Sequence, residues 1–248
     1  MSLSEGPFEF LPSNAEQFCT THWSVVLLAG EESSTRATEA LEKLCRTYWY
    51  PLYVYLRQLS YSPHDAQDLT QGFFARLLEK NFLESVDRRK GKFRSFLLAS
   101  LHHFLANERD RDKVPKRGGK PPISLDEQDA EKRYMQTPRS DLSPERIFER
   151  QWALAILEHA LARLREEYAS SGRAQHFELL KAFLTSDTSN GAYGPVAEKL
   201  QVSPGSVAVA VHRVRHRYRE LVRAEIADTV SSPGDIDDEM RSLCAALS

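Results

Sequence analysis

The sequence predicts an all-α protein made of two small helical domains joined by a flexible linker. In both halves of the 248-residue chain, apolar residues recur at three- and four-residue steps, as they do on one face of an α-helix. A stretch from Lys113 to Pro144 contains paired glycines and prolines and interrupts this periodicity. The composition, 41% hydrophobic and 27% charged residues, is that of an ordinary folded protein. Together these features predict two helical domains on either side of a linker.

The first half predicts a helical domain over residues 34–113, preceded by an N-terminal extension, 1–33, that has no period. A proline at position 51 should kink or divide the first helical segment, because it removes a backbone donor and clashes with the preceding turn. Ser62 and Pro63 are typical of the start of a second helix. The apolar residues of the three segments are Leu41, Leu44, Tyr48, Leu52, Tyr55, Leu56 and Leu59, then Ala66, Leu69, Phe73 and Leu77, then Phe93, Phe96, Leu97, Leu101, Phe104 and Leu105.

The second half predicts a linker over 114–143, a helical domain over 144–225 and a C-terminal extension, 226–248. One helix of the domain has Trp152, Ile156, Ala160 and Leu164 on a single stripe, and a second contains Phe177, Leu180 and Leu184. In the extension, Met240, Leu243 and Leu247 predict a short helix that docks on the rest of the protein.

The segment from Tyr193 to Tyr218 predicts a helix-turn-helix. Pro195 suits a first helical turn, and the small Ala197 allows a second helix to cross closely. Ser203 is a good N-cap, and Pro204 fits the position after it, where a missing N–H costs nothing. The second helix is expected to bury Val207, Val211, Val214 and Tyr218. Such a helix typically lies in the major groove of DNA. An ordinary helical hairpin with a basic end is the alternative interpretation.

Charge is distributed in a way that favours a nucleic-acid partner, although the net charge is only −2. Between Arg88 and Lys120 there are eleven lysines and arginines and three acidic residues. From Arg213 to Arg223 there are five arginines and one glutamate. The sequence therefore predicts two basic surfaces, one in each half of the chain.

Several other classes of protein are not favoured. No GxSxG, P-loop, HExxH or CxxC pattern occurs, so neither an enzyme nor a catalytic residue is predicted. Cys19 and His22 have a chelating spacing but no second pair, so no metal site and no cofactor are predicted. Three distant cysteines indicate a reducing compartment, and the absence of a signal segment or a long apolar run predicts a cytoplasmic protein without membrane contact.

Two stretches resemble the conserved regions of bacterial sigma-70 factors. HDAQDLTQGFFARLLE, from His64 to Glu79, resembles the polymerase-binding helix of region 2. FRSFLLASLHHFLANERDRDK, from Phe93 to Lys113, resembles the helix that reads and melts the minus 10 element. The helix-turn-helix half resembles region 4, which reads the minus 35 element. The order of the halves and the absence of a folded region 3 are similar to the extracytoplasmic-function (ECF) type of RNA polymerase sigma factor.

The resemblance implies partners and candidate site residues. RNA polymerase core is expected to bind through its β′ coiled coil to a face made of Asp65, Asp68 and Gln71, and through its β flap to the second half. Promoter DNA is the other expected partner, and an anti-sigma factor or another regulator is a further candidate. The candidate DNA-binding residues are Arg94, His102, His103, Asn107, Arg109 and Arg111 in the first half, and Ser203, Ser206, Ala208, His212, Arg213, Arg215 and Arg217 in the second.

Some residues depart from the family pattern. Gly72 stands where the family commonly has an acid, and Ala208 and Ala210 stand where basic or polar residues are common. These alanines leave the second helix of the helix-turn-helix with few groups for reading bases. The N-terminal and C-terminal extensions are expected to hold the protein inactive or to receive a signal. A stand-alone helix-turn-helix regulator, which acts without polymerase, is the alternative function.

Overall fold

The computed structural model describes residues 35–77, 92–111, 127–137, 141–185, 193–227, 229–230 and 233–248. Within these ranges the chain is helical and has no strand, so the all-α prediction is confirmed. The helices are α2 (Thr35–Gln58), α3 (Pro63–Leu77), α5 (Phe93–Arg111), α6 (Glu127–Gln136), α7 (Pro144–Ser170), α8 (Ala174–Leu180), α9 (Gly194–Leu200), α10 (Pro204–Ala227) and α11 (Ile236–Leu247), with the short 3₁₀ turns η1 (Lys181–Phe183) and η3 (Pro233–Asp235). None of the described helices is long and apolar enough to cross a membrane.

Helix α2 is the centre of the first half. Residues 52–56 are all buried, so the helix is surrounded by other elements on every side. Of the two effects expected of Pro51, a kink or a division, the division does not occur, because α2 runs as one helix from Thr35 to Gln58. The dense packing of the residues that follow Pro51 offsets the lost backbone hydrogen bond.

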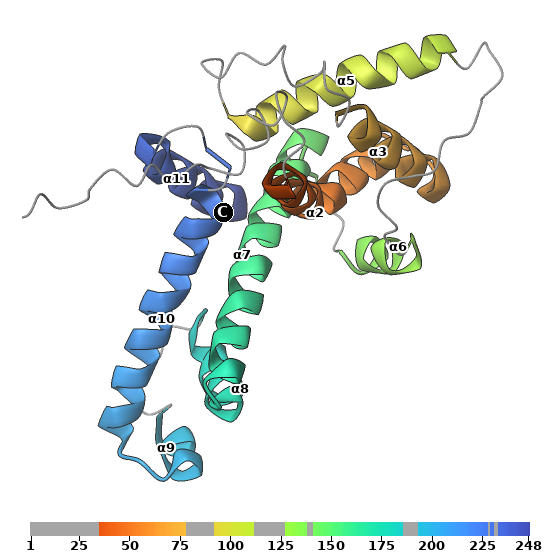
Figure 1. Ribbon diagram of the computed structural model, residues 1–248. Coiled ribbons are helices and arrows are strands. Elements are labelled where there is room, and N and C mark those ends of the chain that lie inside the picture. The colour runs from red at the N-terminus through yellow and green to blue at the C-terminus, as the bar shows by residue number, and fades with distance from the viewer. Residues whose placement is uncertain are drawn as a thin grey trace, which may run out of the picture.

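Helix α7 is the longest element and joins the two halves of the molecule. It packs against α2 on one side and against α10 and α11 on the other (Figure 1). Phe148 and Trp152 of α7 are completely buried, and the Phe148 ring lies edge-on to Tyr55 of α2 at 6.3 Å. Both predicted domains therefore share one continuous hydrophobic core.

The predicted linker is partly helical. Its residues 127–136 form α6, which packs near α2 and α3. Glu131 of α6 accepts hydrogen bonds from Arg57, at 2.9 and 3.1 Å, and from Tyr53, at 2.5 Å. Arg133 lies over the Tyr50 ring at 4.1 Å and pairs with Glu158 of α7. These contacts fix α6 between α2 and α7.

The C-terminal extension docks as predicted. Leu243 of α11 is buried, and α11 packs on α7 and α10. It also reaches α5 through a buried ion cluster, in which Arg94 of α5 pairs with Glu239 of α11 and with Glu149 of α7. One guanidinium group therefore joins three helices from distant parts of the sequence.

Candidate nucleic-acid interface

Helices α9 and α10 form the predicted helix-turn-helix at the end of the molecule far from α5 (Figure 1). The turn is possible because Gln201 adopts a left-handed conformation with φ of 55°, after which Val202 N–H donates to the Ala197 carbonyl at 3.0 Å. Ser203 then caps α10, since its Oγ accepts from the Ser206 N–H at 3.1 Å. Ala197 is buried at the crossing, as the sequence predicted.

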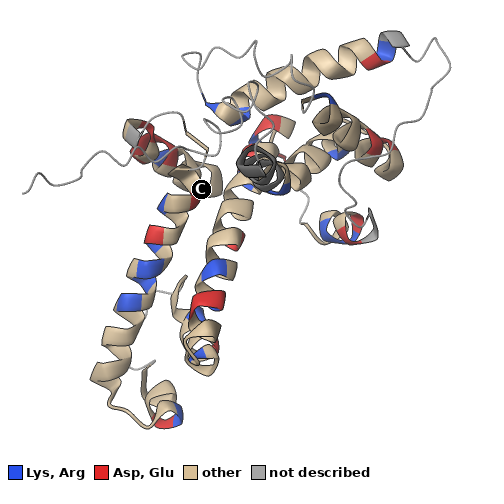
Figure 2. Cartoon of the chain, viewed as in Figure 1, with Lys and Arg blue, Asp and Glu red and all other residues tan. Residues whose placement is uncertain are grey.

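The core side of α10 is also the one predicted. Val207, Val211 and Val214 are buried, and the half-buried Tyr218 donates its hydroxyl to the Leu157 carbonyl at 3.0 Å. The opposite side begins without charge, because no Lys, Arg, Asp or Glu occurs between Pro204 and His212 (Figure 2). The part of α10 nearest the turn is therefore neutral, and the cations start at Arg213, about two and a half helical turns after Pro204.

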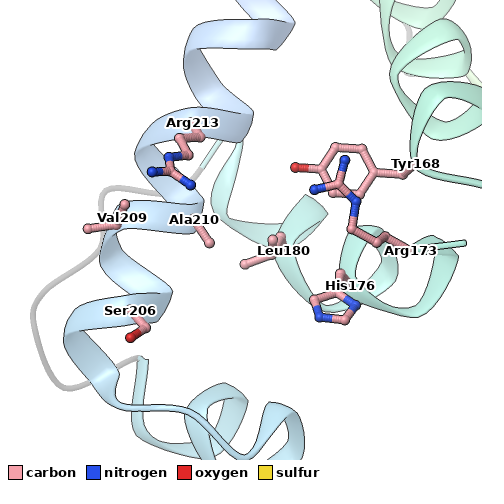
Figure 3. Close-up of a pocket in the computed structure, with 8 residues that line it drawn as sticks. All are labelled: Tyr168, Arg173, His176, Leu180, Ser206, Val209, Ala210 and Arg213. Atoms are coloured by element: carbon pink, nitrogen blue, oxygen red, sulfur yellow. The ribbon is translucent and has the colours of Figure 1, made fainter. Parts of the chain in front are cut away.

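A cavity of about 350 Å³ lies between this face and α8 (Figure 3). Its lining from α10 includes Ser206, Val209 and Arg213. The remaining lining residues are Ala210 on α10 and Tyr168, Arg173, His176 and Leu180 on and around α8. The lining of the cavity thus combines apolar side chains with two arginines and a histidine.

The arginines predicted to bind DNA on α10 differ in their availability. Arg217 makes two hydrogen bonds to Glu167, at 2.9 and 2.7 Å, and one to Glu220 at 2.8 Å, and these bonds raise its pKa. Arg215 donates to the Phe183 carbonyl at 2.8 Å. Arg213 is exposed and forms no ion pair with any residue that the structure describes. The cation best placed to meet a phosphate is therefore Arg213, next to the exposed His212.

On α5, the predicted base-reading residues occupy an exposed face. His103 and Asn107 are exposed, four residues apart and so on the same side of the helix. His102 is also exposed, but its Nε2 lies 2.6 Å from the Tyr55 hydroxyl, which donates to Glu145 at 3.3 Å. Burial and the neighbouring Glu145 carboxylate raise the pKa of Tyr55 to about 12, so this hydroxyl remains protonated.

The predicted cations of α5 are distributed over different environments. Arg94 is buried, with 3% of its side chain exposed, so it lies away from solvent in this arrangement. Arg109 is exposed and donates to the Tyr61 hydroxyl at 3.0 Å. Arg111 ends the helix, and its side chain lies outside the described residues. Among the predicted cations of α5, Arg109 is therefore the one whose side chain is described and exposed. His103 and Asn107 are exposed on the same helix.

The predicted polymerase-binding face lies on α3. Asp65 and Asp68 are exposed and Gln71 is half-buried. Asp65 also stabilises the start of α3, because it accepts from the Ser62 hydroxyl at 2.7 Å while its own N–H donates to Ser62 Oγ at 3.1 Å. Asp68 lies 3.5 Å from His64 Nδ1, in a pair that is charged only when the histidine is protonated.

Packing explains why position 72 has a glycine where the family pattern has an acid. A Cβ atom at this position would lie 3.3 Å from the Phe104 ring of α5, which is tighter than ordinary contacts. Phe104 in turn packs edge-on against Phe73 at 5.9 Å. The missing side chain therefore allows α3 and α5 to approach each other.

Two parts of the cavity lining were not predicted from the sequence: Val209 on α10, and the residues at α8. Val209 was absent from the predicted set because that set was chosen for polar and small side chains, although Val209 is three residues after Ser206 and must share its face. Nothing in the local pattern indicated that Arg173 and His176 lie opposite α10, since the approach of α8 to α10 is a tertiary contact.

Metal binding has no support in the described part of the chain, where no group of three or more His, Cys, Asp or Glu side chains could hold an ion. Cys19 and His22, the pair with chelating spacing, lie outside the described residues.

Comparison with known proteins finds a similarity to a sigma factor. The chain is 25% identical, over 229 residues, to the ECF RNA polymerase sigma factor SigE of Mycolicibacterium smegmatis, a match that covers 89% of this chain and 79% of that protein. No family model matches the chain, and no solved structure does. The similarity extends over both halves of the molecule and is not confined to the helix-turn-helix.

Proposed function

We propose that this protein is an alternative sigma factor of the ECF type, which binds core RNA polymerase and directs promoter recognition and DNA melting. The observation that carries the proposal is the combination, in one chain, of the α9–α10 helix-turn-helix and the helical half that precedes it. The similarity to a sigma factor spans 89% of the chain, so it covers both parts. A stand-alone regulator would usually pair its helix-turn-helix with a dimerisation or ligand-binding domain and would bind duplex DNA without polymerase.

In the proposed mechanism each half has its own partner surface. The carboxylates of Asp65 and Asp68 on α3 meet a basic surface of the polymerase, for which the β′ coiled coil is the candidate. The exposed face of α10 enters the major groove of the minus 35 element, and Arg213 contacts a phosphate. The β flap is the candidate polymerase partner of this half.

The exposed His103 and Asn107 on α5 are the candidates for binding an unstacked base of the minus 10 element. Their ring nitrogens and amide group can donate to and accept from a base edge. The chemistry of RNA synthesis belongs to the polymerase, so the chain needs no catalytic residue, metal or cofactor of its own. Its place of action is the cytoplasm, where polymerase and DNA meet.

The test is reconstitution with purified components. The protein is added to core polymerase and a library of genomic DNA fragments, and the 5′ ends of the transcripts are sequenced. Transcripts that start downstream of a shared two-part motif, and only when the protein is present, support the proposal. Duplex binding without polymerase-dependent initiation would support the alternative, a stand-alone helix-turn-helix regulator.

A further inference from the structure

The exposed face of α10 lacks free polar side chains where such a helix usually reads bases. Ser206 has a hydroxyl group, but this lies 2.9 Å from the Ser203 hydroxyl and belongs to the cap of the helix. Ala208 and Ala210 have no hydrogen-bonding side chain. From Pro204 to Val211, therefore, α10 offers a base edge little hydrogen bonding.

What this face presents instead is an apolar side chain. Val209 is 51% exposed, and among the described residues it is one of four large hydrophobic side chains that are exposed. It lies on α10 between Ser206 and Arg213, and all three residues line the cavity (Figure 3). Its neighbours Ala208 and Ala210 are small and leave it room to approach a flat surface closely.

The floor of the major groove offers one apolar group to such a side chain, the C5-methyl of thymine. We propose that Val209 determines specificity by packing on the methyl group of a thymine in the upstream promoter element. This inference rests on the proposed function. It adds that α10 selects its sequence by contact with a methyl group, with hydrogen bonds to bases in a minor role.

Charge around Val209 favours DNA over a protein as the occupant. Arg213 lies one turn further along α10 and forms no ion pair within the described part of the chain. Across the cavity, Arg173 and His176 are exposed on the α8 side. The major groove presents a thymine methyl group between two phosphate backbones. An apolar side chain with cations on both sides matches this arrangement, because the side chain packs on the methyl group and the cations pair with the phosphates.

The test removes single methyl groups from DNA. A random duplex library is selected with the full chain, alone and with core polymerase, and each thymine of the bound consensus is then replaced by deoxyuridine, which lacks only the methyl group. Binding is measured for the wild type, for Val209→Ala and for the matched control Val202→Ala. Val202 is 45% exposed but lies in the turn before α10, outside the proposed contact.

We expect the wild type to lose about fourfold in affinity when one particular thymine, or one of two neighbours, becomes deoxyuridine, because one methyl contact is lost. Val209→Ala should show no such difference, and Val202→Ala should behave as the wild type. Equal sensitivity of the wild type and Val209→Ala to the missing methyl would overturn the inference and leave the proposed function intact. If Val209→Ala kept the DNA preference of the wild type and bound polymerase more weakly, the inference would also be overturned, because Val209 would then contact a protein. No sequence-selective binding under either condition, together with no initiation, would overturn both.

Discussion

Replacing Arg94 by methionine tests whether the buried ion cluster stabilises the junction of α5, α7 and α11. Arg94 pairs with Glu239 and Glu149, and its guanidinium carbon lies 4.2 Å from the centre of the Trp152 ring. Methionine preserves much of the side-chain volume but removes the charge. Glu239, with 5% of its side chain exposed, then keeps only Lys92, whose Nζ is 3.1 Å from Oε2 without hydrogen-bond geometry.

The expected loss follows from leaving a buried carboxylate without its main partner. Removing one member of a buried pair costs about 3 to 5 kcal/mol, and we expect the lower value, about 3 kcal/mol, because Lys92 remains nearby. For a protein of this size that loss lowers Tm by about 6–12 °C. Replacing Glu239 by glutamine in the same chain removes the stranded charge, so the double variant should recover part of the loss.

The assay is unfolding by urea and by heat, followed by circular dichroism. The matched control is Arg223→Met, because Arg223 also pairs with α11, through Asp237 at 2.6 Å, but that pair is exposed. The reasoning is refuted if Arg94→Met is no less stable than Arg223→Met. Should Arg94→Met keep full stability and lose promoter opening in the reconstituted system, Arg94 is a DNA contact, as the sequence alone predicted.

Three further predictions concern the other surfaces. Asp65→Asn with Asp68→Asn should weaken binding to core polymerase at least tenfold and leave Tm nearly unchanged, since Ser62 still caps α3 and an asparagine at position 65 can still accept from the Ser62 hydroxyl; unchanged affinity in a titration with labelled polymerase would contradict the assignment. Asn107→Ala should impair use of the minus 10 element more than polymerase binding, and an equal loss of both would argue against base capture. Burial alone would raise the pKa of Glu131, but hydrogen bonds from Arg57 and Tyr53 outweigh it and lower that pKa. The stability from this contact is therefore present above about pH 4.5, the ordinary pKa of the group, and declines as pH falls through the lowered value. Urea unfolding of the wild type and Glu131→Gln from pH 3 to 7 should show a difference that shrinks on acidification.

Local features of the fold could be predicted from the sequence because their causes are local. Ser203 and Pro204 set the start of α10 through a hydrogen bond that spans three residues. The stripe through Trp152, Ile156 and Ala160 follows from the helical repeat, and all three residues are buried. Pro51 does not divide α2, since the cost of a proline inside a helix is offset by tertiary packing that spacing does not reveal.

The ion-pair partners of the charged residues could not be predicted from the local sequence. Arg217 meets Glu167, fifty residues away in sequence, and Arg94 meets Glu239, 145 residues away. Such partners are brought together by the fold, so a count of arginines overestimates the cations that remain for DNA. The same holds for Val209, whose exposure depends on which side of α10 the core covers.

The packing of α7 sets a geometric condition on the proposed promoter contacts. Its first turn, at Glu145, lies beside Tyr55 and His102, and its last turns, at Tyr168, line the cavity with Val209. These positions are 23 residues apart on one helix, a length of about 35 Å. At about 3.4 Å per base pair, this corresponds to about 10 base pairs of straight duplex DNA. If the two promoter elements are further apart, α7 has to separate from α2 before both are bound, and the contacts of Glu145 with Tyr55 and of Glu149 with Arg94 oppose that movement. The spacing of the mapped elements therefore decides whether the arrangement seen here can bind a promoter directly or has to open first.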